Sequence, residues 1–243
     1  MNHFLIIIPS YNEEQNLGKV LEGLLSMGLP ADILVVDDGS ADQTAEIAAR
    51  YPVTVVSHPY NLGYGAALQT GFMYARERNY RYVVQFDADG QHNPQDLPAI
   101  MNELMQEDVE IVMGSRFMEN SSDYQLGALK KLGIKFFRGL IYSLTGTKIS
   151  DPTSGLRGVS EKVYRYYAGW DCFPADYPDA DILIQMILRR YRIREIPAHM
   201  RIREAGISMH AGIKPLFYMM KISLCILIVL LRHTLSKRVS NYE

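Results

Sequence analysis

Residues 4–14 read FLIIIPSYNEE, an apolar run that ends at a proline and is followed at once by polar side chains. An apolar run of this length, bounded in this way, predicts a buried strand over Phe4–Ile8. A helix over Glu14–Met27 is expected to follow it. The same order of strand, polar cluster and helix returns along the chain, and this repetition indicates the fold class.

Strands and helices alternate with short links through the first half of the chain. Further strands are predicted at Ile33–Val36, Val53–Ser57, Tyr82–Phe86 and Glu110–Met113. Helices are predicted near Asp42–Ala49, Gly65–Arg78 and Pro94–Glu107. Because the strands are apolar on both faces, we expect an α/β fold with a mainly parallel sheet flanked by helices.

The alternation weakens after Arg116. A helix is predicted over Gly127–Leu144, a strand over Arg192–Ile196 and a very apolar helix over Pro215–Arg232. We therefore expect a nucleotide-binding half at residues 1–116, an acceptor half at 117–212, and an apolar helix with a basic tail at 213–243.

Composition and charge narrow the class of protein. With 48% hydrophobic and 21% charged residues, the chain is typical of a folded globular protein, and its two cysteines suggest neither disulfides nor a zinc site. Residues 1–185 contain 14 Lys and Arg against 24 Asp and Glu, whereas residues 186–243 contain 11 against 3. The basic end suits a phosphate or a lipid surface, although a solvated basic face would have the same composition.

Three polar clusters each follow the end of a predicted strand. They are Ser10–Glu13, Asp37–Ser40 and Asp87–Gln91. Ligands of open α/β sheets bind beyond the carboxyl ends of the strands, so the clusters are expected to converge on one cleft.

The run DADGQ at residues 87–91 has the chemistry of a divalent-metal site. Two carboxylates and an amide oxygen suit Mg²⁺ or Mn²⁺, which commonly bridge carboxylates to substrate phosphates. In isolation the same run could be a capped turn. Asp37 and Asp38 could accept hydrogen bonds from a base or a ribose, and they too could simply form a turn before a helix.

Seven ordered motifs resemble glycosyltransferase family 2 and its GT-A fold. They are IIIPSYNEEQNL, ILVVDDGSADQT, NLGYGAALQTGF, QFDADGQHNPQDLP, MGSRF, DPTSGLRG and IREIPAHMRIREAGISM. Within the family the chain is most similar to dolichyl- and polyprenyl-phosphate sugar synthases. The resemblance implies an inverting, metal-dependent transfer of a sugar from a UDP- or GDP-sugar.

The resemblance also implies roles for individual residues. Nucleotide-sugar contacts are expected from Pro9, Tyr11, Asn12, Glu13, Asp37, Asp38, Gly63, Asp87 and Ala88. Metal ligation is expected from Asp89 and Gln91, and contacts with the acceptor phosphate from Arg116, Lys131 and Arg203. Asp89, Arg116 and Arg203 are also expected to be catalytic. For the two arginines the reason is that guanidinium groups bind phosphate oxygens in a forked geometry.

The acceptor decides whether a general base is needed. A lipid phosphate is already anionic near neutral pH, whereas a sugar hydroxyl must lose a proton to a carboxylate. Asp181 is the candidate base, Asp179 is the alternative, and both could instead mark an exposed helix start.

The tail and the missing secretory signal bear on location. The apolar segment Leu216–Leu231 would be about 24 Å long as a helix, shorter than a hydrocarbon core of about 30 Å. We expect a cytoplasmic protein, peripheral at the inner face of the cell membrane, held by lipid or by a small membrane protein. The same helix could belong to the core or to a homodimer, and no nucleic-acid partner is expected.

Two other functions remain open at this point. One is a glycosyltransferase that extends a cell-envelope polysaccharide or glycolipid through a hydroxyl. The other is a catalytically silent nucleotide-binding scaffold, although such a protein would not need to retain metal ligands. A nucleotidyltransferase is disfavoured because no glycine-rich, lysine-bearing loop follows the first strand.

Overall fold

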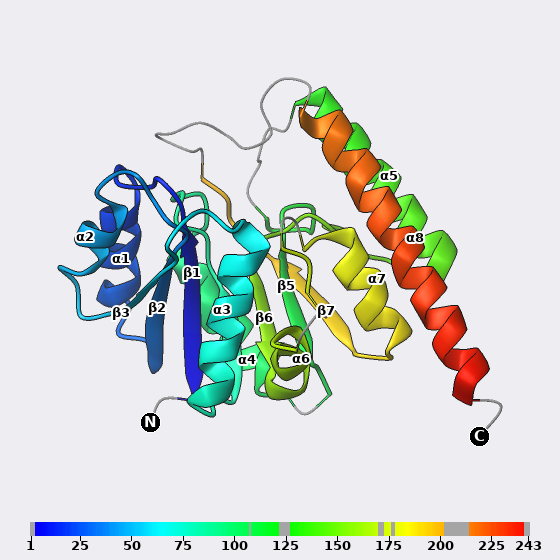
Figure 1. Cartoon of the computed structure of the whole chain (residues 1–243), viewed down its shortest axis with the longest axis horizontal. Helices are drawn as coiled ribbons and strands as arrows, with labels where there is room; N and C mark the ends of the chain where they lie inside the picture. Colours follow the sequence, from blue (N-terminus) through cyan, green and yellow to red (C-terminus); the bar gives the residue numbers. More distant parts are fainter. Residues whose placement is uncertain are drawn as a thin grey trace. The chain divides into compact units, whose positions relative to one another are not determined.

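Seven strands form one sheet in the computed structural model, which describes residues 3–106, 108–121, 127–169, 173–175, 178–201 and 214–240. The strands are β1 (Phe4–Ser10), β2 (Ala31–Asp37), β3 (Thr54–Ser57), β4 (Tyr82–Gln85), β5 (Ile111–Ser115), β6 (Arg157–Ser160) and β7 (Ile193–Pro197). Their order in the sheet is β3-β2-β1-β4-β6-β5-β7 (Figure 1). Strands β1 to β5 and β7 confirm the six strands predicted from the sequence.

The sheet is mainly parallel, as predicted. β1 pairs in parallel with β2 and β4, β2 with β3, and β5 with β7. β6 is the exception, because it lies antiparallel between β4 and β5. Its four residues, RGVS, contain no apolar run, and no strand was predicted there.

Helices cover both faces of the sheet. The helices around the sheet are α1 (Leu17–Ser26), α2 (Thr44–Ala48), α3 (Tyr64–Glu77), α4 (Leu97–Leu104) and α6 (Glu161–Tyr167), with a 3₁₀ turn at Pro94–Asp96. Side chains alternate along β1: Phe4, Ile6 and Ile8 share a core with α1 and α4, whereas Ile7 lies against Gly71 of α3. This period of two is the pattern of a strand buried on both faces.

The chain forms two compact units that do not follow the sequence linearly. The first comprises Met1–Tyr124, Ser154–Tyr177 and Arg192–Gly206, and includes the whole sheet. The second comprises Gln125–Thr153, Pro178–Tyr191 and Ile207–Glu243. The functional boundaries predicted at residues 116 and 212 remain predictions.

The second unit is helical. It contains α5 (Ala128–Thr145), α7 (Ala180–Leu188) and α8 (Lys214–Ser240), and α8 packs against both other helices. The predicted helices at 127–144 and 215–232 are confirmed, although α8 extends further than predicted, and α6 and α7 were not predicted. No helix among the described residues has both the length and the mean hydropathy that a membrane-spanning helix needs.

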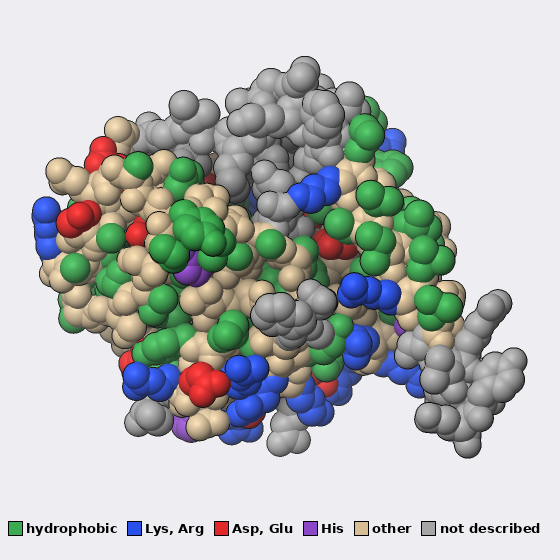
Figure 2. Space-filling model, viewed as in Figure 1, with side chains coloured by type: hydrophobic (Ala, Val, Ile, Leu, Met, Phe, Trp, Pro, Cys, Tyr) green, Lys and Arg blue, Asp and Glu red, His purple; other side chains and the backbone are tan. Residues whose placement is uncertain are grey.

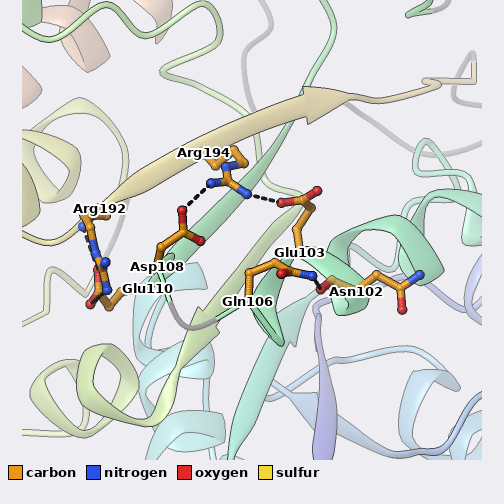
Figure 3. Close-up of polar contacts among 7 residues, drawn as sticks. All are labelled: Asn102, Glu103, Gln106, Asp108, Glu110, Arg192 and Arg194. Carbon is orange, nitrogen blue, oxygen red and sulfur yellow. Dashed lines mark hydrogen bonds and ion pairs between the residues drawn. The ribbon is translucent and has the colours of Figure 1, made fainter.

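Ion pairs hold the edge strand β7 to its neighbours. The guanidinium of Arg194 contacts Glu103 of α4 at 2.5 Å and Asp108 at 2.8 Å, and Arg192 pairs with Glu110 at 2.8 Å (Figure 3). Charged side chains are a common feature of edge strands because they discourage pairing with another chain. β7 leads into the segment 198–201, which contacts the candidate site.

Candidate active site

The three predicted polar clusters lie at one edge of the sheet. They follow β1, β2 and β4, which are parallel neighbours, so their carboxyl ends point the same way. Direct hydrogen bonds join the first two clusters: the Asn12 amide donates to Ser40 Oγ at 3.0 Å, and the Ala41 amide donates to Asn12 Oδ1 at 2.9 Å. The strand order thus places the three clusters at one edge of the sheet, and the single cleft expected there stays a prediction.

Asp38 anchors the glycine-bearing loop that opens α3. Its carboxylate, 3% exposed, accepts hydrogen bonds from the amides of Leu62 at 2.9 Å and Gly63 at 2.8 Å, and from His58 Nδ1 at 2.7 Å. Gly63 has a φ of 105°, which strongly favours glycine. The loop therefore depends on a buried carboxylate at the end of β2, in addition to any contact that Asp38 makes with a ligand.

Asp87 is held from two sides. Its Oδ1 accepts a hydrogen bond from the Tyr64 hydroxyl at 2.8 Å, and its Oδ2 accepts one from His92 Nε2 at 2.9 Å. A side chain at position 155 would overlap the carboxylate, so Gly155 permits this close approach. The Asp87 side chain keeps 27% of its surface exposed. It is thus a fixed acceptor that still reaches solvent.

The electrostatics of this pair favour a charged carboxylate. Burial raises the pKa of Asp87 and is the largest single effect, but His92, Tyr64 and Arg157 together outweigh it and lower this pKa. Burial likewise acts to lower the pKa of His92, and the adjacent Asp87 carboxylate reverses the direction and raises it. The nearby charge of Arg116 acts against protonation of His92. These shifts favour an ionised Asp87 carboxylate, which the hydrogen bonds from His92 and Tyr64 hold in place.

Asp89 and Gln91 have the chemistry of ligands for a divalent cation. Asp89 Oδ1 accepts a hydrogen bond from the Gln91 amide at 3.0 Å, and both side chains are partly exposed. Gln91 Nε2 donates to the Arg201 carbonyl at 3.4 Å, so the amide oxygen is the atom that can meet a cation. No group of three or more His, Cys, Asp or Glu side chains that could hold a metal occurs in the described part of the chain. The residues fit a cation that takes its other ligands from a diphosphate and water.

The remaining predicted nucleotide contacts surround this edge. Tyr11 is 47% exposed, Pro9 and Ala88 are buried, and Glu13 is half-buried. Asp37 Oδ1 accepts a hydrogen bond from the Ser40 amide at 3.2 Å, as in a turn. An exposed aromatic ring beside several acceptors suits a stacked base.

Arg116 follows β5 directly and is half-buried. Its guanidinium lies 5.7 Å from the centre of the Phe117 ring. Arg203 lies outside the described residues. The role predicted for each arginine stays a prediction.

Two predicted site residues belong to the second unit. Asp181 lies in the first turn of α7 and is 4% exposed, which differs from the exposed helix start considered as an alternative. Burial raises its pKa to about 6, with a further contribution from the charge of Asp179. Lys131 is an exposed residue of α5. A buried carboxyl with a raised pKa is a common feature of functional sites.

Several residues of the site were missed from the sequence. Tyr64, His58, His92 and Gly155 had no assigned role, although three of them lie within the quoted motifs NLGYGAALQTGF, QFDADGQHNPQDLP and DPTSGLRG. The motifs marked the segments. The sequence does not reveal the side chains that support Asp87, because they lie 5 to 68 positions away from it along the chain.

A mainly parallel sheet with carboxylate-bearing clusters beyond its strand ends is the architecture of a nucleotide-binding α/β protein. The sequence model described as glycosyl transferase family 2 matches residues 5–167. The chain belongs to this family, and it is a glycosyltransferase.

Similar proteins agree with this assignment. The chain is 30% identical over 177 residues to a UDP-N-acetylglucosamine–dolichyl-phosphate N-acetylglucosaminyltransferase of Methanococcus voltae, covering 66% of this chain and 70% of that protein. It is 31% identical over 219 residues to an undecaprenyl-phosphate mannosyltransferase of Micrococcus luteus, covering 86% and 87%. The predicted resemblance to polyprenyl-phosphate sugar synthases is confirmed.

A solved structure shares the fold. Glucosyl-3-phosphoglycerate synthase of Mycobacterium tuberculosis, in complex with Mn²⁺ and UDP-glucose, has a TM-score of 0.69 and 21% identity, over 93% of this chain and 77% of that one. The predicted GT-A fold is confirmed by this likeness.

Proposed function

We propose that the chain transfers a sugar from a nucleoside-diphosphate sugar to a polyprenyl phosphate at a membrane surface, with inversion at the anomeric carbon. The observation that carries the proposal is the cluster of fixed carboxylates beyond β1, β2 and β4 in a chain whose relatives are named for transfer to polyprenyl phosphates. The donor is proposed to be a UDP- or GDP-sugar, and the transfer assay below distinguishes the two.

Each part of the edge has a distinct task in this proposal. The exposed ring of Tyr11 stacks on the base, and Asp37 and Asp38 accept hydrogen bonds from the nucleoside. Pro9, Asn12, Glu13, Gly63 and Ala88 complete the donor site. Asp87, held in place by Tyr64 and His92, accepts a hydrogen bond from the nucleotide. A donor bound in a fixed position loses little further entropy on reaching the transition state.

Mg²⁺ or Mn²⁺ on Asp89 and Gln91 would supply positive charge to the leaving diphosphate. The mycobacterial structure that shares this fold was solved with Mn²⁺ and UDP-glucose, which supports a divalent cation and a nucleotide-sugar as ligands in this proposal. Arg116 and Arg203 add guanidinium groups for phosphate oxygens, and Lys131 a further cation for the acceptor phosphate.

The acceptor is assigned to residues 117–212 in this proposal. A polyprenyl phosphate presents its headgroup at the membrane surface, so the chain is proposed to act there as a peripheral protein. A location at the inner face of the cell membrane, a small membrane-protein partner and a homodimer remain predictions.

One observation favours a second acceptor class. Asp181 has a pKa of about 6, so near neutral pH it is mainly ionised and can accept a proton. An anionic phosphate does not require such a base, whereas a sugar hydroxyl does. Transfer to a hydroxyl of a saccharide or glycolipid is therefore the alternative, with Asp179 as the neighbouring carboxylate.

The test separates these acceptors. Radiolabelled UDP- and GDP-sugars are incubated with undecaprenyl phosphate or with a saccharide, and the product is partitioned between organic solvent and water. We expect label in the organic phase, its loss on chelation, and its return with Mn²⁺ or Mg²⁺. Label that enters only the saccharide would contradict the lipid-phosphate proposal and support the alternative.

Asp89→Asn and Glu14→Gln form a matched pair for this assay. Asp89→Asn should lower turnover by about a hundredfold or more, because one cation ligand loses its charge. Glu14 is an exposed residue directly after the Ser10–Glu13 cluster, and its Oε2 accepts a hydrogen bond from the Gln43 amide that a glutamine oxygen can also accept. Glu14→Gln should therefore leave turnover within about twofold of the wild type. Equal activity of the Asp89→Asn variant and the wild type would exclude Asp89 as a metal ligand.

A further inference from the structure

Helix α8 is apolar on two opposite faces. Ile222 and Ile226 are buried within the second unit, where α8 packs against α5 and α7. The other face has six apolar side chains that are 44% to 64% exposed, here called the apolar stripe: Met220, Leu224, Leu227, Ile228, Leu231 and Leu235. An apolar face of a helix is normally covered by other apolar structure.

The apolar stripe is continuous along the helix. Its members follow one another at spacings of one, three or four residues, which places them on one side of an α-helix. From Met220 to Leu235 the stripe is about 22 Å long. Figure 2 shows hydrophobic side chains gathered along α8. Contiguous apolar surface of this kind marks a site of interaction.

Two exposed basic side chains border the stripe on the same flank. Lys221 and Arg232 are eleven residues apart, so they differ by only about 20° around the helix axis. Both have long apolar stems that can lie along an apolar surface while the charge remains in a polar layer. This is the arrangement of a helix that lies in the plane of a membrane interface.

The positive charge of α8 and α5 favours an anionic lipid surface over a second copy of the chain as the partner of the stripe. The 27 residues of α8 include five Lys and Arg and no Asp or Glu, and the 18 residues of α5 include four and none. A second copy placed on the stripe would bring like charges together at both ends. An anionic lipid surface offers apolar chains to the stripe and phosphates to Lys221 and Arg232.

We propose that the apolar stripe of α8 docks into the surface of an anionic lipid bilayer, with Lys221 and Arg232 at the level of the lipid phosphates. The inference rests on the proposed function for its biological purpose, because a polyprenyl phosphate acceptor resides in that bilayer. Its physical basis is the exposed stripe and the charge of α8, and these are independent of catalysis.

Vesicle flotation tests the surface directly. The purified full chain is mixed with vesicles of phosphatidylcholine alone, or with about 30% phosphatidylglycerol, at low and at high salt. We expect binding to the anionic vesicles, weakened by salt. The double variant Leu224→Asp and Leu231→Asp should weaken binding by more than about tenfold, and Lys221→Gln with Arg232→Gln by about thirtyfold.

Met73→Asp is the matched control, since Met73 is 45% exposed on α3 of the first unit. It should bind vesicles as the wild type does, and circular dichroism verifies that each variant is folded. Unchanged binding by the Leu224→Asp, Leu231→Asp variant would overturn the proposal. So would failure of the wild type to float with anionic vesicles, or a dimer in light scattering that this variant converts to monomer.

A short-chain, water-soluble prenyl phosphate separates this inference from the proposed function. Without vesicles, the Leu224→Asp, Leu231→Asp variant should transfer sugar to it at the wild-type rate. Vesicle binding without any transfer would leave the docking surface standing and overturn the proposed acceptor. Transfer by a wild type that does not bind vesicles would support the proposed acceptor and overturn the docking surface.

Discussion

Replacing Asp181 by asparagine should make the stability of the protein less dependent on pH. Asp181 is 4% exposed, and burial raises its pKa from 3.8 to about 6. Between these two values the folded state holds a proton that the unfolded state has released. The free energy of unfolding therefore falls as the pH rises from about 4 to about 6, and it does not recover above that window.

The size of the effect follows from the shift in pKa. A change of about two pKa units corresponds to about 3 kcal/mol between the two protonation states. Asparagine has nearly the same shape and does not titrate. The difference in unfolding free energy, variant minus wild type, should therefore increase by about 2 kcal/mol between about pH 4 and pH 7, because the unfolded state is already partly ionised at pH 4.

Urea denaturation followed by circular dichroism measures this difference at each pH, and urea avoids the charge screening that guanidinium would introduce. Other titrating groups are common to both proteins and cancel. Asp179→Asn is the control, because it removes a charge that raises the pKa of Asp181. This variant should narrow the pH range over which the stability falls, without abolishing the fall. A difference between Asp181→Asn and wild type that stays constant across the window would refute the reasoning, because Asp181 would then titrate as an ordinary surface carboxyl.

Three further predictions concern the first unit. Tyr64→Phe removes the hydroxyl that donates to Asp87 at 2.8 Å and should lower kcat/KM for the donor by about tenfold, measured by initial rates. Gly65→Ala places a methyl group against the Pro174 carbonyl and should lower the unfolding free energy by about 1–3 kcal/mol, measured in urea. Asp38→Asn presents an NH₂ group to donors of the 61–64 loop and should cost about 1–3 kcal/mol, also in urea.

Neighbouring positions supply the controls for these variants. Tyr60→Phe alters an exposed ring and should leave kcat/KM unchanged. Ala66→Ser alters a half-buried position beside Gly65 and should cost less than Gly65→Ala. If Tyr64→Phe behaved like Tyr60→Phe, Tyr64 would not position Asp87. Unchanged stability of the Gly65→Ala or Asp38→Asn variants would show that the loop and α3 adjust without strain.

Several features of this protein were determined by the sequence alone. The apolar runs at Phe4–Ile8, Ile33–Val36 and Tyr82–Phe86 predicted buried strands, because a strand covered on both faces must be apolar at every position. The polar residues that follow each apolar run in the sequence were therefore expected at one edge of a parallel sheet. Local pattern and the rule for strand ends were sufficient to place the three clusters together.

Other features were decided only by the tertiary structure. β6 is too short and too polar to be recognised, and it becomes a strand because β4 and β5 both pair with it. The support of Asp87 by Tyr64, the burial of Asp181 and the exposure of the apolar stripe on α8 also could not be seen in any short window. Each depends on which distant segments pack against a side chain, and packing sets solvation, hydrogen-bond partners and pKa together.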